Sequence, residues 1–274
     1  MIQTSKKQLR NTMNYIFKLL LFIYQTRKSW WYTSTCRTKA RFIRTFLGSF
    51  WLGLSNLLSI AVLAGVYGTV FKVANFKDYS IYLGLGLVVW NYISSSVLGS
   101  AAIFEINSMN IKNSNINPIF YVVEEWAFQL QTFAQSFSLV LLVLSFIKFS
   151  LISNFIIYSL PGLINLLIFL FWFPLLVCMA GARFQDIYQL VPIIMQLLFL
   201  LTPILYKKEN LSSLAWVADY NIFYILLSTI RDSMIFGEGI MLKKNIFVLL
   251  FNLIGLLFTL VGYKKIRKKI PFYI

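Results

Sequence analysis

The sequence contains no histidine and only two cysteines, Cys36 and Cys178, in 274 residues. It therefore offers no zinc-ligand cluster, no Cys-X-X-Cys redox pair and no disulfide framework. Charged residues are scarce as well, at 12% of the chain against about 25% in soluble domains. Because 59% of the residues are hydrophobic and the mean hydropathy is +0.74, a soluble globular fold is excluded. We expect an all-α integral membrane protein without a metal site.

Acidic residues are the next shortage, since nine Asp and Glu face 25 Lys and Arg and the net charge is +16. Ten of the bases lie in residues 1–45 and five in residues 264–274. Such blocks can indicate nucleic-acid binding. In a chain this apolar they instead indicate the positive-inside rule, by which basic segments stay in the cytoplasm beside membrane lipids. We expect no nucleic-acid partner and cytoplasmic termini.

The sequence also lacks an energy source of its own. It contains no Gly-Lys dipeptide, so the phosphate-binding Gly-X-X-X-X-Gly-Lys-Ser/Thr loop is absent. No ionisable residue lies in the cores of the expected spans, where proton- or sodium-coupled transporters usually carry one. If transport is driven by ATP, another polypeptide binds the ATP and Mg. The chain is then not an enzyme and holds no cofactor.

Long uncharged stretches define the expected spans, because an α-helix needs about 20 apolar residues to cross the hydrocarbon core. Six stretches qualify, at residues 47–71, 79–104, 126–147, 163–182, 187–206 and 245–263. The fourth is expected to follow a turn at Pro161 and Gly162. An even number of spans places both termini on one side. With that side cytoplasmic, together with Lys112 and Arg183, 17 of the 25 bases lie inside and 8 lie outside, among them Lys77 and Lys207.

Two segments outside the spans are expected to lie at the membrane surface. Residues 15–24 are too short to span and include Lys18, which predicts an N-terminal amphipathic helix in the cytoplasmic interface. Residues 207–244 hold an apolar run of 11 residues, 220–230, of a length typical of re-entrant or interfacial segments. The expected organisation is a basic cytoplasmic segment (1–45), a six-span domain (46–263) and a basic cytoplasmic tail (264–274).

Four stretches carry a resemblance to a known family: LGSFW at 47–51, YLGLGLVVWN at 82–91, GARFQDI at 181–187 and LLTPILY at 200–206. Together they resemble the permease subunits of ABC transporters that export polysaccharides and polyol phosphates, such as O-antigen, capsule and teichoic-acid exporters. The resemblance covers residues from about 40 to 240. Its most specific part is ARFQD, followed about twenty residues later by TPI.

The resemblance implies an inner-membrane homodimer of six-helix permease subunits with two cytoplasmic ATP-binding subunits. The implied cargo is a glycan on undecaprenyl diphosphate, with O-antigen for lipopolysaccharide biosynthesis as the leading expectation. It also implies a coupling loop at residues 107–125, outward gate helices within 207–244, and a translocation channel made mainly by the first and fifth spans. A permease for a small lipid or drug and an intramembrane glycosyl or acyl transferase remain alternatives.

Candidate contacts with the cargo begin with Arg37, Arg41 and Arg44, whose i, i+4, i+7 spacing predicts one helical face. A guanidinium fork can donate two hydrogen bonds to a diphosphate. Alternatively, the three side chains hold anionic lipid headgroups. In the channel, aromatic rings would pack on sugar rings and amides would bond their hydroxyls. Candidates on the first and fifth spans are Trp51, Asn56, Tyr67, Phe71, Gln196, Phe199 and Tyr206.

The remaining candidates lie at the cytoplasmic side. Residues expected to couple to the ATPase are Asn117, Pro118, Glu124 and Glu125. Arg183 and Asp186, at i and i+3, are expected to form a structural ion pair. Neutral amides within the spans either bond neighbouring helices or line a path for a hydroxyl-rich cargo. They are Asn56, Asn91, Gln129, Gln131, Gln135, Asn165, Gln196 and Asn252.

Overall fold

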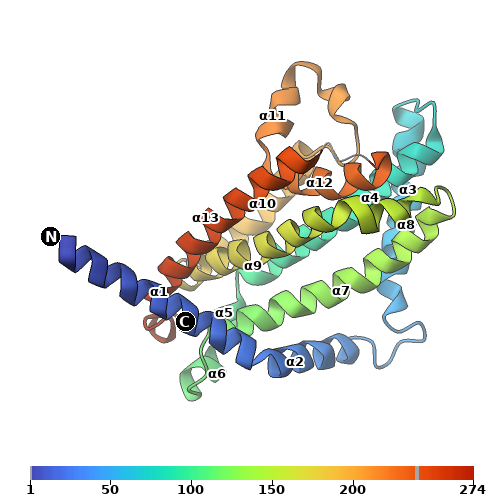
Figure 1. The fold of residues 1–274 in the computed structure, drawn as a ribbon. Helices are drawn as coiled ribbons and strands as arrows, with labels where there is room; N and C mark the ends of the chain where they lie inside the picture. Colours follow the sequence, from blue (N-terminus) through green and yellow to red (C-terminus); the bar gives the residue numbers. More distant parts are fainter. Residues whose placement is uncertain (1, 238–240) are drawn as a thin grey trace.

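The computed structural model describes residues 2–237 and 241–274, and the regular elements of these residues are all helical (Figure 1). Helices suit so apolar a chain because they satisfy every backbone hydrogen bond within one segment. In chain order the elements are α1 (Ile2–Gln25), α2 (Arg27–Ala40), α3 (Phe50–Val70), α4 (Phe76–Ser100), α5 (Ile103–Ile106), α6 (Ser108–Asn113), α7 (Ile119–Ser145), α8 (Ser150–Asn154), the π-helical η1 (Phe155–Ser159), α9 (Leu160–Arg183), α10 (Ile187–Leu201), the 3₁₀ segment η2 (Lys208–Leu214), α11 (Ala215–Tyr220), α12 (Ile222–Phe236), α13 (Leu242–Ile266) and α14 (Ile270–Tyr273).

Helix α4 forms the centre of the bundle. It is continuously buried from Tyr79 to Trp90 and packs against α3, α7, α9, α10 and α12. Helices α3 and α13 lie at the periphery, where apolar side chains such as Val62 and Ile254 are exposed. Exposed apolar side chains on peripheral helices are expected where lipid or another subunit covers them. The all-α membrane fold is confirmed.

The two ends of the bundle carry different segments (Figure 1). The proximal end, as we call it, holds α2, α5, α6 and the C-terminus. The distal end holds the α3–α4 turn, α8 and α11. At the proximal end the last turn of α9 lies against the end of α4, because Gly181 leaves no room for a Cβ beside the carbonyl oxygen of Ala101. Lys112 and Arg183 thus lie at the end that also bears the C-terminus.

Among the described residues, five helices and not the expected six are long and apolar enough to cross a membrane. The expected fifth span, 187–206, is helical only as α10, which has 15 residues. At a rise of 1.5 Å per residue such a helix is about 22 Å long, shorter than a hydrocarbon core of about 30 Å. It ends at Leu201 because Pro203 disfavours helical geometry at the preceding residue, and Thr202 is extended at ψ 126°.

Two other expected boundaries are corrected. Helix α7 begins at Ile119, so its first turns include Glu124 and Glu125, which were expected in the coupling loop. The chain also stays helical from Ser150 to Arg183, so the expected turn at Pro161 and Gly162 is wrong, and η1 immediately precedes these residues. Pro161 is tolerated because it lies in the first turn of α9, where the backbone N–H that proline lacks is not needed for an α-helical hydrogen bond.

The N-terminal segment is more helical than expected, since α1 extends over residues 2–25 rather than 15–24. One face, with Tyr15, Leu19 and Phe22, packs into a hydrophobic cluster at the proximal end, while Lys18 on another face is exposed. The predicted helix is present, and its place in the membrane interface stays a prediction. Helix α2 then lies along α7. In the expected gate region, α11 and α12 are both too short to span, and residues 238–240 lie outside the described residues.

Candidate functional site

A stripe of polar side chains follows one face of α7. Glu125, Gln129, Thr132 and Ser136 are spaced by four, three and four residues, which brings them onto a single helical face. The adjacent helix α4 presents Asn91, Ser95 and Gly99 at intervals of four. The two rows meet closely, because a Cβ built at Gly99 would lie 3.0 Å from Glu125 Oε1 and 3.4 Å from Gln129 Nε2. Glycine at position 99 thus allows the polar rows to pack.

Asn56 on α3 joins these two rows by hydrogen bonds. Its Nδ2 donates to Ser136 Oγ at 2.6 Å, and its Oδ1 accepts from Asn91 Nδ2 at 2.7 Å. Further along α7, Gln129 Nε2 donates to Glu125 Oε1 at 2.8 Å. Three helices thus contribute to one set of polar side chains, and some of their hydrogen-bonding groups are paired with one another.

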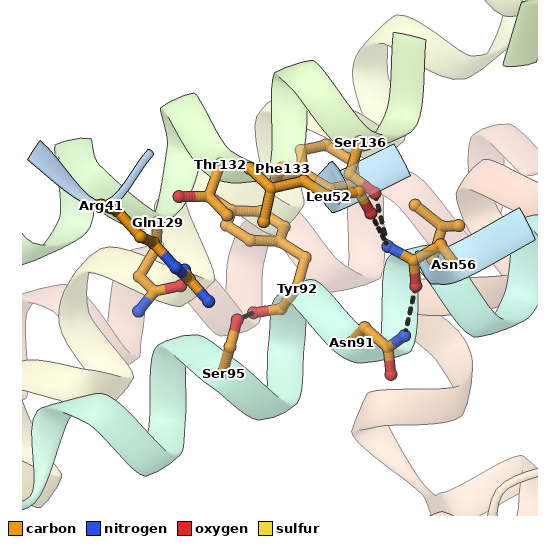
Figure 2. Close-up of a pocket in the computed structure, with 11 residues that line it drawn as sticks. Arg41, Leu52, Asn56, Asn91, Tyr92, Ser95, Gln129, Thr132, Phe133 and Ser136 are labelled. Carbon is orange, nitrogen blue, oxygen red and sulfur yellow. Dashed lines mark hydrogen bonds between the residues drawn. The ribbon is translucent and has the colours of Figure 1, made fainter. Parts of the chain in front are cut away.

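This set of side chains borders a cavity of about 220 Å³ between α3, α4 and α7 (Figure 2). Arg41 and Gln129 lie side by side at one end of the view, and Asn56 and Asn91 lie at the other. Its wall also includes Leu52, Val88, Tyr92, Ser95, Thr132, Phe133 and Ser136. The cavity therefore combines one guanidinium, several hydroxyls and amides, and an apolar floor.

The floor is held rigidly by aromatic stacking, since the rings of Tyr92 and Phe133 lie 4.3 Å apart with an angle of 13° between their planes. The Tyr92 hydroxyl is buried and has no hydrogen-bond partner among the described residues, and the same holds for the hydroxyl of Ser96 one turn further along α4. A buried hydroxyl without a partner is energetically costly. Tyr92 thus contributes its side chain to the wall of the cavity, while its hydroxyl is buried within the protein.

The structure separates the three candidate arginines. Arg41 lines the cavity, but Arg37 makes an ion pair with Glu125 at 2.5 Å and approaches Glu124 at 3.8 Å. The guanidinium of Arg37 also lies 4.1 Å from the ring centre of Phe128. Helix α2 ends at Ala40, so Arg44 follows the helix in an exposed turn. The expected single helical face of three arginines is therefore wrong for Arg44.

The Arg37 ion pair also changes the interpretation of the two acids. Glu125 is buried and faces α2, and Glu124 is partly buried beside the same guanidinium. A polar seam continues this contact, because Gln131 Nε2 donates to the hydroxyls of Ser34 and Thr35, both at 3.0 Å. The two glutamates therefore attach α2 to α7 within the chain.

Asn117 and Pro118 lie in a different groove, of about 410 Å³, at the proximal end. Arg267, Lys268 and Pro271 of the C-terminal segment form its other wall. Asn117 Oδ1 accepts a hydrogen bond from the Tyr263 hydroxyl at 2.5 Å, and that hydroxyl accepts from the Ile119 amide at 2.9 Å. The loop before α7 is thus fixed to the end of α13. Its role in coupling stays a prediction.

The other candidate channel residues do not gather in one place. Tyr67 and Phe71 stack on each other at 5.7 Å, and Phe199 packs on Trp90 of α4 at 5.8 Å. The Tyr206 hydroxyl donates to the Leu200 carbonyl at 2.7 Å. Trp51 and Gln196 are exposed. Of the seven candidates only Asn56 lines the cavity. However, α3 and α10 both pack against α4, so the two expected channel helices flank a common neighbour.

The expected ion pair between Arg183 and Asp186 is not formed. Both residues are exposed, and the ion pairs among the described residues do not include them. The Arg183 guanidinium instead lies 5.2 Å from the ring centre of Phe184. Because α9 ends at Arg183 and α10 begins at Ile187, the two residues flank a bend and do not share one helical face.

Sequence reasoning singled out Asn56, Asn91, Gln129 and Arg41 but missed the hydroxyl residues Ser95, Thr132 and Ser136. The spacing of the α7 stripe could have revealed Thr132 and Ser136, and the four-residue spacing from Asn91 on α4 could have revealed Ser95. By contrast, Asn165 and Asn252 bond α9 to α13. Asn165 Nδ2 donates to the Asn245 carbonyl at 3.0 Å, and Asn252 Oδ1 accepts from the Trp172 ring at 3.0 Å. These two amides hold helices together.

Comparison with known proteins decides the family. Residues 35–235 match the family described as ABC-2 type transporter. The chain belongs to this family. Two curated relatives, both named O-antigen export system permease protein RfbA from Klebsiella pneumoniae, are 25% and 24% identical to the chain. The first match covers 95% of each protein and the second covers 93% of each. This multi-pass membrane protein is thus an ABC permease of the polysaccharide-export kind, as the four sequence stretches indicated.

Proposed function

We propose that this chain is the membrane subunit of an ABC exporter that moves an undecaprenyl-diphosphate-linked polysaccharide, O-antigen in the first instance, from the cytoplasm to the periplasm. The observation that carries the proposal is the match to the two O-antigen export permeases over 93% or more of each chain. ATP hydrolysis on a separate subunit drives the export, because this sequence has no phosphate-binding loop. The active assembly contains two copies of this chain and two ATP-binding subunits.

The polar cavity supports a cargo rich in hydroxyls and carrying phosphate. In this proposal Arg41 donates its guanidinium fork to the diphosphate at the proximal end. Asn91, Ser95 and Gln129 then exchange hydrogen bonds with sugar hydroxyls. A cavity of about 220 Å³ is small beside ordinary ligand pockets of about 300 to 1,000 Å³. It therefore suits one short section of a long cargo.

The orientation of the proposed exporter follows from its charges. The proximal end faces the cytoplasm, since it carries the basic C-terminal segment. The groove with Asn117, Pro118, Arg267 and Lys268 then faces the ATP-binding subunits. The expected outward gate segments, α11 and α12, lie on the periplasmic side.

The test is deletion of the protein followed by analysis of the surface glycans of the cell. We expect loss of one glycan from the surface and accumulation of its lipid-linked form inside. Complementation by the intact chain should restore export only when the ATP-binding partner keeps its catalytic residues. A normal glycan profile in the deletion strain would refute the proposed cargo. Glycan synthesis by the isolated chain would instead identify a transferase.

A further inference from the structure

The segment between α10 and η2 is irregular, yet its backbone is fixed by side chains of other helices. The Tyr79 hydroxyl donates to the Leu205 carbonyl at 2.6 Å. The Tyr82 hydroxyl lies 3.2 Å from the carbonyl oxygens of both Pro203 and Tyr206. Backbone carbonyls outside regular helices need such partners when they are buried. Residues 202–206 therefore form a turn that is held by side-chain hydrogen bonds, and we call it the distal turn.

Arg231 on α12 is the charged member of this arrangement. It is 1% exposed, and its Nη1 donates to the Pro203 carbonyl at 2.8 Å. Its Nε donates to Asp232 Oδ1 at 2.8 Å, and its guanidinium lies 3.7 Å from the ring centre of Tyr82. Burying a guanidinium is costly unless such partners are present. Apolar packing alone would not need a cation here.

The helix that carries Arg231 is itself anchored at both ends. Asn221 caps its first turn by accepting from the Phe223 amide at 3.0 Å, and its Nδ2 donates to Thr202 Oγ1 at 2.9 Å. At the other end Lys148 Nζ donates to the Ile235 carbonyl at 2.7 Å. Asn154 Nδ2 donates to the Met234 carbonyl at 2.9 Å. Helix α12 is therefore a fixed support against which the distal turn is held.

Gly86 on α4 provides the space for this contact. A Cβ at position 86 would lie 3.4 Å from Arg231 Nη1 and 3.6 Å from Ile204 Cγ2. Helix α4, the distal turn and α12 thus meet at one point, with the guanidinium between them. Since α10 ends in the distal turn, the same contact fixes the distal end of α10.

We propose that Arg231 is a positioning residue that joins the distal turn to α4 and α12 and thereby keeps the distal end of the permease closed to small solutes at rest. The inference goes beyond the proposed export function and uses it only for one readout. Without the guanidinium the Pro203 carbonyl loses its closest donor, and the distal turn can leave α4. The distal end of α10 would then move with it.

The test replaces Arg231 with Met, which keeps an unbranched apolar stem but removes the charge and the hydrogen-bond donors, and with Lys. Each variant is purified with its ATP-binding partner and reconstituted into vesicles that contain a small fluorescent dye. We expect Arg231→Met to release the dye at least fivefold faster than the unmodified chain without ATP, and Arg231→Lys to show an intermediate rate. Glycan export by cells should fall in the same order. Arg27→Met, at an exposed arginine on α2, is the matched control and should retain the dye.

A crosslink distinguishes positioning from general stability. In a chain with Ser at positions 36 and 178, Gly86→Cys and Ile204→Cys are combined with Arg231→Met. Oxidation ties the distal turn to α4 without the guanidinium, and reduction of the same sample removes the tie. We expect the oxidised protein to retain the dye and the reduced protein to release it. Equal release in both states, or normal retention and export by Arg231→Met alone, would refute the proposal. If Arg231→Met releases the dye slowly but no longer exports glycan, the proposed seal is refuted, whereas the proposal that the chain is an exporter is not.

Discussion

Arg37 and Arg41 lie one helical turn apart, yet their surroundings give them different tasks. Arg37 is paired with Glu125 and packs on Phe128, so its fork is largely engaged within the chain. Arg41 borders the polar cavity, and its guanidinium is 5.6 Å from the ring centre of Phe42. Their helical spacing in the sequence could not distinguish these two tasks. The acid that pairs with Arg37, Glu125, lies on α7, 88 residues further along the chain.

At this scale the first prediction concerns Arg41→Lys. Lysine keeps the charge but cannot form the two parallel hydrogen bonds that a diphosphate accepts from arginine. We expect surface glycan to fall about tenfold, corresponding to roughly 1.4 kcal/mol of lost binding, with normal membrane insertion. Quantitative staining of surface glycan, with immunoblotting of the membrane fraction, measures both. Export equal to that of the unmodified protein would favour binding of lipid headgroups over binding of cargo.

The second prediction concerns Arg37 and Glu125. Arg37→Met leaves the buried Glu125 carboxylate without its cation, which should lower the free energy of unfolding by about 1 to 3 kcal/mol. Because the Arg37 side chain is 47% exposed, solvent screening favours the lower part of this range. Thermal inactivation of the detergent-solubilised protein measures the loss. The double variant with Glu125→Gln should recover part of it. Additive losses would contradict a direct contact between the two residues.

At the scale of single helices, the sequence predicted positions better than ends. The apolar runs located the cores of α3, α4, α7, α9 and α13, because about 20 apolar residues have few alternatives to a spanning helix. The start of α7 was misplaced because charged residues were assumed to lie outside the bundle. Glu124 and Glu125 are instead neutralised by Arg37 from α2. The early end of α10 could have been predicted, since Thr202 precedes a proline.

The third prediction tests the packing of α9 on α13. A Cβ added at Gly255 would lie 2.5 Å from the ring of Trp172, whereas the nearest atom to a Cβ at Gly262, Met179 Cε, is 3.8 Å away. Gly255→Ala should therefore destabilise the protein by about 1 to 3 kcal/mol through overpacking. Gly262→Ala, the matched control, should be neutral or stabilising by up to about 1 kcal/mol. Thermal unfolding in detergent compares the two. A stable Gly255→Ala variant would mean that the two helices can separate locally.

At the scale of the whole molecule, the arrangement of the ends was predictable and the cavity was not. Counting spans and bases placed residues 112 and 183 together, and α5, α6 and the C-terminus share the proximal end. This result survives the shortening of α10, because a short helix still returns the chain to the distal end. The cavity depends on a three-helix contact among Asn56, Asn91 and Ser136. Distances in the sequence carry no information about such a contact.

The last prediction is the orientation of this molecule in the membrane. Single cysteines replace Lys112 and Arg183 at the proximal end and Lys77 and Lys207 at the distal end. Cys178 is buried, so Cys36, which is exposed, is the native thiol that must be replaced first. The basic C-terminal segment at the proximal end predicts that a membrane-impermeant maleimide added to intact cells labels positions 77 and 207 but not 112 and 183. All four should react once the membrane is opened. Labelling of position 112 from outside would reverse the orientation, place α11 and α12 in the cytoplasm, and refute both the proposed cargo entry at Arg41 and the docking of the ATPase at the proximal groove.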